Sequence, residues 1–281
     1  MYQLIAENES GEALELTFNR AYSVLEVDGA NPPKASISTA AVSGIDGAVF
    51  IGSRIEPRNI VITLAVHPPV EANRIRLFSI FRVKRWIRIR YRNAHRSVYI
   101  DGYVESVELT PWAQSVQPII SIICPNPFWL SDADTNIRFS GSLALFEFPF
   151  SISAEGVEFS QVLKETAATV DVGEIETGGI ITFRALGAVT NPIFYNRTAQ
   201  TFIGVNIEMQ EDDLVTICTE RGKKSVTLLR SGTVTNLINS RATGSTWLTF
   251  LPGKNSVDYD ATSGANNLDV TVTIRRKFEG V

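Results

Sequence analysis

Alternation of apolar and polar residues with a period of two limits most strongly how this chain can fold. It is clearest over residues 59–66 and 268–274, and it recurs over residues 98–105. In the first two segments every second residue is aliphatic: Ile60, Ile62, Leu64 and Val66, then Leu268, Val270, Val272 and Ile274. Gly- and Asn-containing turns separate such runs at intervals of about ten residues, as in antiparallel sandwiches or barrels. The pattern predicts a mostly β protein.

One segment departs from this period. After Pro68-Pro69, the spacing of Leu77, Phe78 and Phe81 predicts a short amphipathic helix over residues 70–82, with Ile80 turned to another angle. The prolines lie at or before its first turn, and Glu71 follows near the positive end of the helix dipole. We expect this helix to lie across the open face of a sheet.

The segment Cys124-Pro125-Asn126-Pro127-Phe128-Trp129 marks the end of the first half of the chain. Its two prolines prevent a central strand from continuing, and the large apolar pair behind them requires a core to pack against. A short polar, turn-prone stretch follows. We therefore predict two domains. Residues 1–130 would form a β-sandwich with one helix, and residues 131–281, which are rich in Gly, Thr and Asn, a second β-sandwich.

Composition excludes several classes of protein. The net charge of −4 is too small to indicate a polyanion partner, and the first half is close to neutral. The only two cysteines, Cys124 and Cys218, are too far apart for a disulfide framework or a zinc site, so we expect two buried free thiols. No apolar run reaches the length of a membrane span, and no apolar signal segment follows Met1. We expect synthesis in the cytoplasm without a signal peptide and no membrane partner.

The most concentrated positive charge lies in residues 82–92. As a strand from position 86 onward, this segment would place Arg88, Arg90 and Arg92 in a ladder on one face. The residues between them, Ile87, Ile89 and Tyr91, would pack inward. Arginine is favoured at interfaces for its planar donor fork. We predict that the ladder forms a solvated face or a contact between subunits.

A groove for single-stranded nucleic acid would be the alternative use of this segment, with Trp86 and Tyr91 stacking on bases. We expect both rings on the face opposite the arginines, where they could not stack together with the ladder. That placement and the near-neutral charge of the first half argue against a specific nucleic-acid partner.

No catalytic, metal-binding or cofactor-binding pattern is present. The two histidines, His67 and His95, lie near no nucleophile motif, and no phosphate-binding or dinucleotide-binding glycine pattern occurs. Asp101 and Glu105 would be roughly 13 Å apart along one strand, wider than a glycosidase pair. The acidic turn Gln210-Glu211-Asp212-Asp213 lacks the donor spacing of a Ca²⁺ loop, so we interpret it as a solvated β-turn. We predict a protein that is not an enzyme and has no cofactor.

Trp247 is the one residue of the second domain that could stack on a sugar ring. In a strand it would face away from Leu248 and Phe250, so it would lie either in a second covered face or at the surface. Its roles as a core or interface residue and as a platform for a saccharide both remain open.

Several segments together resemble the distal tail proteins of long-tailed, siphovirus-type phages. In the first half they are a Gly-x-x-Gly turn, an arginine-containing strand and the domain-closing segment: Gly44-Ile45-Asp46-Gly47, Gly52 to Ile60, and Cys124 to Trp129. In the second half they are a glycine pair followed by Asn-Pro, a Pro-Gly turn and the closing residues: Gly178-Gly179 with Asn191-Pro192-Ile193, Leu251 to Asn255 with Tyr259, and Phe278 to Val281. Their order and spacing carry the resemblance.

The resemblance implies a virion structural protein. Its first domain would assemble head-to-tail into a hexameric ring, and its second would be a galectin-like or jelly-roll β-sandwich. The ring would be a hub of the distal tail or baseplate that joins the tail tube to the tip and carries the host-adsorption apparatus. Expected partners are copies of the same chain, the tube-side or terminator-side proteins, a tail-tip or tail-associated protein and a receptor-binding protein. The alternative is a carbohydrate-binding module that recognises host cell-wall saccharides through Trp247.

Overall fold

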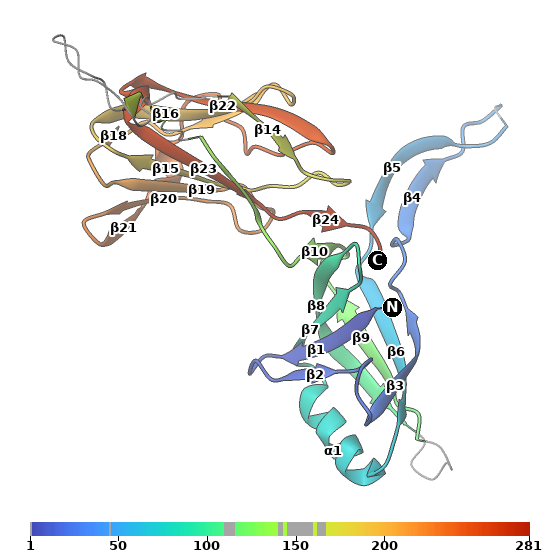
Figure 1. Ribbon diagram of the computed structural model, residues 1–281. Helices are drawn as coiled ribbons and strands as arrows, with labels where there is room; N and C mark the ends of the chain where they lie inside the picture. Colours follow the sequence, from blue (N-terminus) through green and yellow to red (C-terminus); the bar gives the residue numbers. More distant parts are fainter. Residues whose placement is uncertain (1, 45, 110–115, 140–142, 145–159, 162–166) are drawn as a thin grey trace. The chain divides into compact units, whose positions relative to one another are not determined.

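The computed structural model describes residues 2–44, 46–109, 116–139, 143–144, 160–161 and 167–281 (Figure 1). Strands dominate these residues and a single α-helix accompanies them, so the predicted fold class is confirmed. The chain divides into two compact units. Unit 1 comprises Met1–Ala133 and Phe278–Val281, and unit 2 comprises Asp134–Lys277. In sequence, unit 2 is therefore an insertion into unit 1. The last four residues, which we had placed in the second domain, pack in unit 1.

Unit 1 is built on one sheet of nine strands. Its main path runs β2-β1-β7-β8-β9-β6-β3, with β10 beside β8 and β24 beside β10 (Figure 1). The strands are β1 (Gln3–Asn8), β2 (Ala13–Glu15), β3 (Tyr22–Asp28), β6 (Arg58–Val66), β7 (Trp86–Arg92), β8 (Ser97–Glu108), β9 (Ile119–Cys124), β10 (Trp129–Ser131) and β24 (Lys277–Phe278). A separate two-stranded sheet pairs β4 (Ala35–Ala40) with β5 (Val49–Ile55).

The predicted helix is present as α1 (Val70–Ile80), with Pro69 at its N-cap and Glu71 in its first turn. It contacts β1 and β6, so it lies against the sheet as expected (Figure 1). Its buried face differs from the prediction, since Ile80 is buried with Leu77 whereas Phe78 is exposed. The reason is geometric. A residue three positions along a helix returns to nearly the same face, whereas the next residue is turned by about 100°.

The core of unit 1 follows the alternation in its strands. Ile60, Ile62 and Leu64 on β6 are fully buried, as are Ile87 and Ile89 on β7. Trp129 joins the same cluster at the end of unit 1, which confirms the predicted core packing for this residue, whereas Phe128 beside it is only half-buried. The Trp129 ring centroid lies 6.4 Å from that of the Tyr91 ring.

Unit 2 contains two larger antiparallel sheets. One has the order β11-β23-β15-β19-β20-β21, and the other runs β14-β22-β16-β17 with β18 beside β16 (Figure 1). Their strands are β11 (Thr135–Arg138), β14 (Ala167–Asp171), β15 (Ile180–Ala185), β16 (Val189–Asn196), β17 (Thr201–Gly204), β18 (Glu208–Met209), β19 (Leu214–Cys218), β20 (Ser225–Arg230), β21 (Thr233–Asn236), β22 (Lys254–Ser263) and β23 (Leu268–Ile274). The remaining elements are the pair β12 (Leu143–Ala144) and β13 (Ser160–Gln161) and the 3-10 turns η1 (Ile238–Ser240) and η2 (Ala265–Asn267).

The two sheets of unit 2 enclose one core, as in a β-sandwich. Phe183 on β15 and Val272 on β23 come from one sheet, and Phe194 on β16 and Tyr259 on β22 come from the other. Phe139 packs edge-on against both of the latter rings, with centroid distances of 5.9 and 5.6 Å. This packing fixes the two β-sheets face to face.

Both cysteines are free thiols, as expected. Cys124 is fully buried in unit 1, but Cys218 is only half-buried, because it lies on the outward-facing side of β19. Among the described residues, no helix is long and apolar enough to cross a membrane.

Candidate functional site

The β4–β5 hairpin of unit 1, called here the arm, carries in its two strands five of the large apolar side chains that the described residues expose. Val49, Phe50 and Ile51 are 53–66 % exposed, and Ile37 on the opposite strand is 64 % exposed. Val49 and Ile51 alternate with Phe50, so both faces of the arm are apolar. A two-stranded sheet has no core of its own, and contiguous exposed apolar residues mark interaction surfaces. The arm is therefore the strongest candidate for a contact with another chain.

Sequence analysis did not single out the arm as a site. Its turn, Gly44 to Gly47, was noted for the resemblance alone, and Ile45 within it lies outside the described residues. The available signal was the run Val49-Phe50-Ile51, which breaks the alternation of a one-sided strand. Such a run is typical of a strand that is covered on both faces, either by its own chain or by another chain.

The predicted arginine ladder lies on β7 as expected, with Ile87 and Ile89 on the buried face. The structure pairs its first two arginines inside the chain. Arg88 Nε donates to Asp101 Oδ1 at 2.7 Å and Arg88 Nη2 donates to Asp101 Oδ2 at 3.0 Å, which is a bidentate pair. This pairing raises the pKa of Arg88.

Arg90, the second arginine of the ladder, binds two carboxylates. Arg90 donates to Glu7 Oε2 at 2.9 Å and to Asp132 Oδ1 at 2.6 Å. Arg92, by contrast, is exposed, and within the described part of the chain it donates only to the Ser97 hydroxyl, at 3.2 Å. The ladder is therefore a half-buried, largely neutralised surface. Whether it touches another subunit stays a prediction.

The expected placement of the aromatic residues beside the ladder is wrong for Trp86. Positions 86 and 88 differ by two, so Trp86 lies on the same face as the arginines. The Arg88 guanidinium carbon lies 5.2 Å from the Trp86 ring centroid and 4.0 Å from that of Tyr99. Arg88 thus covers two rings, and this argues against base stacking for a different reason than the one first given.

A shallow hollow of about 360 Å³ lies on unit 1, lined by Tyr2, Thr17, Phe18, Ser23 and Val24. Within it the Ser23 hydroxyl lies 2.7 Å from His67 Nε2, a contact that sequence analysis missed because 44 residues separate the two. A nucleophile and base need a third group that orients the base. The described residues supply no such group, so the geometry does not amount to a catalytic triad.

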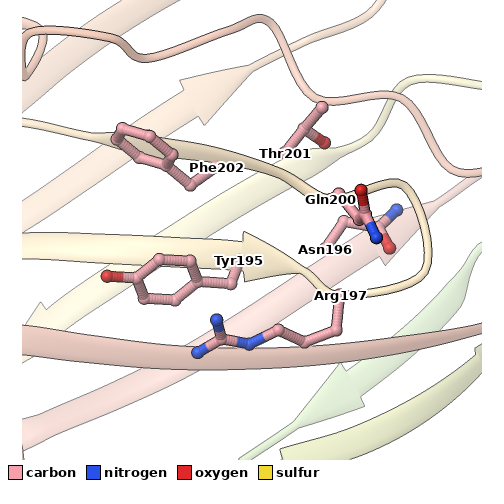
Figure 2. A pocket seen from close by; sticks show the side chains of 6 residues that line it. All are labelled: Tyr195, Asn196, Arg197, Gln200, Thr201 and Phe202. Carbon is pink, nitrogen blue, oxygen red and sulfur yellow. The ribbon is translucent and has the colours of Figure 1, made fainter.

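A second hollow, of about 290 Å³, lies in unit 2 at the hairpin between β16 and β17 (Figure 2). Tyr195 and Phe202 form a cross-strand aromatic pair with centroids 5.9 Å apart. Figure 2 shows Arg197 beside the Tyr195 ring, and its guanidinium carbon lies 4.1 Å from that centroid. Arg197 also forms a bidentate pair with Asp258. The charged group at this hollow is thus paired within the chain, whereas the buried Thr201 hydroxyl has no hydrogen-bond partner among the described residues.

Trp247 is half-buried against the core of unit 2. Two cations lie near its ring, the Arg241 guanidinium carbon at 4.7 Å and Lys224 Nζ at 5.5 Å from the centroid. A sugar would compete with these cations for the ring face. Its role as a saccharide platform stays a prediction.

The acidic turn is not fully solvated, contrary to the interpretation from sequence. Asp213 is 2 % exposed, and its carboxylate accepts hydrogen bonds from Arg230 Nε at 2.9 Å and from the Gln210 backbone N–H at 2.8 Å. The hydrogen bond from Arg230 lowers the pKa of Asp213. The other three residues of the turn, Gln210, Glu211 and Asp212, are exposed. Among the described residues, no group of three or more His, Cys, Asp or Glu side chains could hold a metal ion.

Comparison with known proteins agrees with the sequence motifs. Residues 172–278 match the family described as the siphovirus-type tail component, C-terminal domain. The resemblance to siphovirus-type tail proteins is confirmed. The Dit protein of phage SPP1, described as a paradigm of the hub adsorption apparatus in phages that infect Gram-positive hosts, aligns with a TM-score of 0.70 and 11 % identity, over 99 % of both chains.

Two structures of the phage P2 baseplate in its activated conformation also match. The calcium form aligns at a TM-score of 0.54 with 12 % identity, and the strontium form at 0.56 with 13 % identity, each over the whole of both chains. No curated protein matches the chain. At these identities the structural likeness establishes a shared fold.

Proposed function

We propose that this protein is a structural component of the phage virion that forms a ring-shaped hub in the distal tail or baseplate. The alignment of the whole chain with a protein described as a hub, at a TM-score of 0.70, carries the proposal. The family match over residues 172–278 supports it independently. The function would thus depend on interfaces between chains, with no catalysis and no cofactor.

The arm provides the physical means of assembly. A closed ring, hexameric by family likeness, uses two different and complementary patches on each subunit. The exposed arm is one such patch. The apolar hollow around Phe18, which is 58 % exposed, offers a second of matching character on the same unit. A stable contact of this kind hides about 800 Å² or more per partner.

The arginine ladder is the proposed rim of the same contact. Arg88 and Arg90 keep their carboxylate partners within the chain, so a subunit packing over them would bury paired rather than bare charges. Burying a bare charge in the contact would instead destabilise it by several kcal/mol, on the order of 3–5. Arg92, the exposed rung, is then free to bind an acidic or carbonyl group of the neighbour.

In a tail, such a hub would bind the tube-side or terminator-side protein on one face and a tail-tip or tail-associated protein on the other. It would also carry the receptor-binding apparatus. The protein would be made in the cytoplasm of the bacterial host and end in the virion.

Negative-stain imaging at high protein concentration, with mass determined by light scattering, tests the proposal. The wild type is expected to form six-fold rings or ring pairs. The double variant Phe50→Ser/Ile51→Ser should remain monomeric with an unchanged melting temperature, because these side chains are already exposed. The matched control is Val234→Ser in unit 2, where an equally exposed residue should be replaceable without loss of rings. A wild type that stays monomeric alone and in the presence of its tube-side neighbour would contradict the proposal.

A further inference from the structure

Arg58, part of the family-like motif that the proposed function leaves unused, is buried and binds main-chain oxygens. It is 4 % exposed, although arginine is among the residues least often buried. Its Nη1 donates to the carbonyl oxygens of Gly29 at 2.8 Å and Asn31 at 2.9 Å, with Ala30 at 3.4 Å. Its Nη2 donates to the carbonyl oxygen of Glu279. One guanidinium therefore joins two segments that are more than two hundred residues apart.

Both ends of the arm leave the sheet at this guanidinium. Residues 29–31 connect β3 to β4, where the arm begins, and Arg58 itself is the first residue of β6, just after the arm ends in β5. Gly29 is held tightly here, with φ at +79°, and an added Cβ would lie 2.0 Å from the Asn59 carbonyl oxygen. The base of the arm thus has little freedom to shift while Arg58 keeps its partners.

Residues 278–281 form the third part of the junction. The Val281 backbone N–H donates to the Ala30 carbonyl oxygen at 3.3 Å. An added Cβ on Gly280 would lie 2.9 Å from Pro32 Cδ, so the two chain segments are in close contact. Arg96 donates to the Gly280 carbonyl oxygen and lies over the Phe278 ring, 4.7 Å from its centroid.

We propose that Arg58 and residues 278–281 form a clamp that fixes the direction in which the arm leaves the nine-stranded sheet of unit 1. The planar fork of arginine suits this task, because it presents several donors in one rigid plane, whereas lysine offers a single nitrogen. The inference rests on the proposed function in one respect, namely that the arm is the assembling element. It assigns Arg58 as a positioning residue, and it makes the return of the chain from unit 2 a determinant of assembly.

Distances between spin labels in the full-length protein test the clamp directly. One label is placed on the arm at Ser53→Cys and the other on α1 at Ala72→Cys, both exposed positions, in a Cys218→Ser background. The labelled protein with no substitution in the clamp should give a single narrow distribution of distances between the two labels. Arg58→Gln and Arg58→Lys should both broaden this distribution. Arg54→Gln is the matched control, because Arg54 is an arm arginine whose described ion pair, with Glu56, is exposed, and it should keep the narrow distribution.

Two further variants separate positioning from folding. Phe278→Ala removes no donor or acceptor of the Arg58 hydrogen bonds and weakens only the packing of residues 278–281 against Arg96, so it tests the clamp if Arg58→Gln does not fold. Gly280→Val should displace the arm by pressing on Pro32. Narrow, unshifted distributions in the folded Arg58 variants, or in Phe278→Ala and Gly280→Val, would overturn the clamp.

Ring formation by the same variants distinguishes this inference from the proposed function. Broadened distances together with a wild type that forms no rings would support the clamp and reject the hub. Rings in the wild type with unchanged distances in the variants would reject the clamp and leave the hub intact. If both hold, Arg58→Gln should lose rings while Arg54→Gln keeps them.

Discussion

Unit 1 and unit 2 each bury a core of alternating apolar residues, but they differ in how many large apolar residues they expose. Of the large apolar residues that the described parts of the chain expose, fourteen lie in unit 1 and four in unit 2. The two units are of similar size, so the contrast is not one of area. Exposed apolar residues that occur singly are ordinary, whereas contiguous ones mark a surface built to be covered. Among the described residues, unit 2 exposes few large apolar side chains, whereas unit 1 exposes the contiguous apolar surface of the arm.

The same contrast holds within unit 1 itself. Its nine-stranded sheet covers one face with its own core and α1, while the arm leaves both of its faces open. The clamp at Arg58 lies where these two parts meet. An exposed apolar surface would therefore be held in place by buried groups at its base.

The largest expected effect is a difference in the free energy of unfolding between a substitution in the core of unit 2 and one in the arm. Phe183→Ala removes a fully buried ring and should lower the free energy of unfolding by about 3–5 kcal/mol. Phe50→Ala removes a ring that is 62 % exposed and should change it by less than about 0.5 kcal/mol. Urea denaturation of the monomer measures both. A cost for Phe50→Ala comparable to that of Phe183→Ala would mean that the arm is packed within its own chain.

The next effect concerns the ion pair of unit 2 between the buried Asp213 and the partly exposed Arg230. Asp213→Asn removes the carboxylate that Arg230 and the Gln210 N–H bind, and should cost about 2 kcal/mol at neutral pH. Because the hydrogen bond from Arg230 lowers the pKa of Asp213 in the folded state, its stabilisation is present above the unfolded value of about 4. It is lost as the pH falls through the lower folded value.

Denaturation of wild type and Asp213→Asn across a pH series checks the sign. The difference in unfolding free energy between them should be constant from neutral pH down to about pH 4 and shrink below it. Asp212→Asn, one residue away, serves as the control and should show little difference at any pH, because its ion pair with Arg184 is exposed on both sides. A difference in unfolding free energy that grows as the pH falls would contradict a lowered pKa of Asp213 in the folded state.

Sequence alone predicts the parts of this molecule that follow from local periodicity. The alternation in β6 and β23 identified their buried faces, and the prolines before α1 located its start. It could not reveal that Asp213 is buried, because the partner Arg230 lies on a neighbouring strand. The arm was missed for the converse reason. Its apolar run looks like a buried strand, and only the three-dimensional arrangement shows that the described residues of unit 1 leave it exposed.

A smaller effect would sharpen the interpretation of the arginine ladder. The exchange Arg88→Asp/Asp101→Arg keeps an internal ion pair but reverses its direction and removes the guanidinium from the Tyr99 ring, so it should cost the monomer about 1 kcal/mol. If the ladder contacts a neighbouring subunit, rings should be lost although the monomer stays folded. Rings of normal yield would confine the ladder to unit 1 and leave the arm as the principal contact.

The smallest effect uses the two thiols as reporters, since each unit contains one. Cys124 is fully buried, and burial raises the pKa of its thiol to about 12, so a thiolate reagent at neutral pH should not modify it in the folded protein. Cys218 is half-buried and should react slowly without unfolding. Labelling in increasing urea, read by mass spectrometry of peptides, then follows the opening of unit 1 through Cys124. If Phe183→Ala advances only the labelling of Cys218, the two units unfold separately. A parallel advance at Cys124 would show that the insertion of unit 2 into unit 1 couples their stability, as the clamp of residues 278–281 suggests.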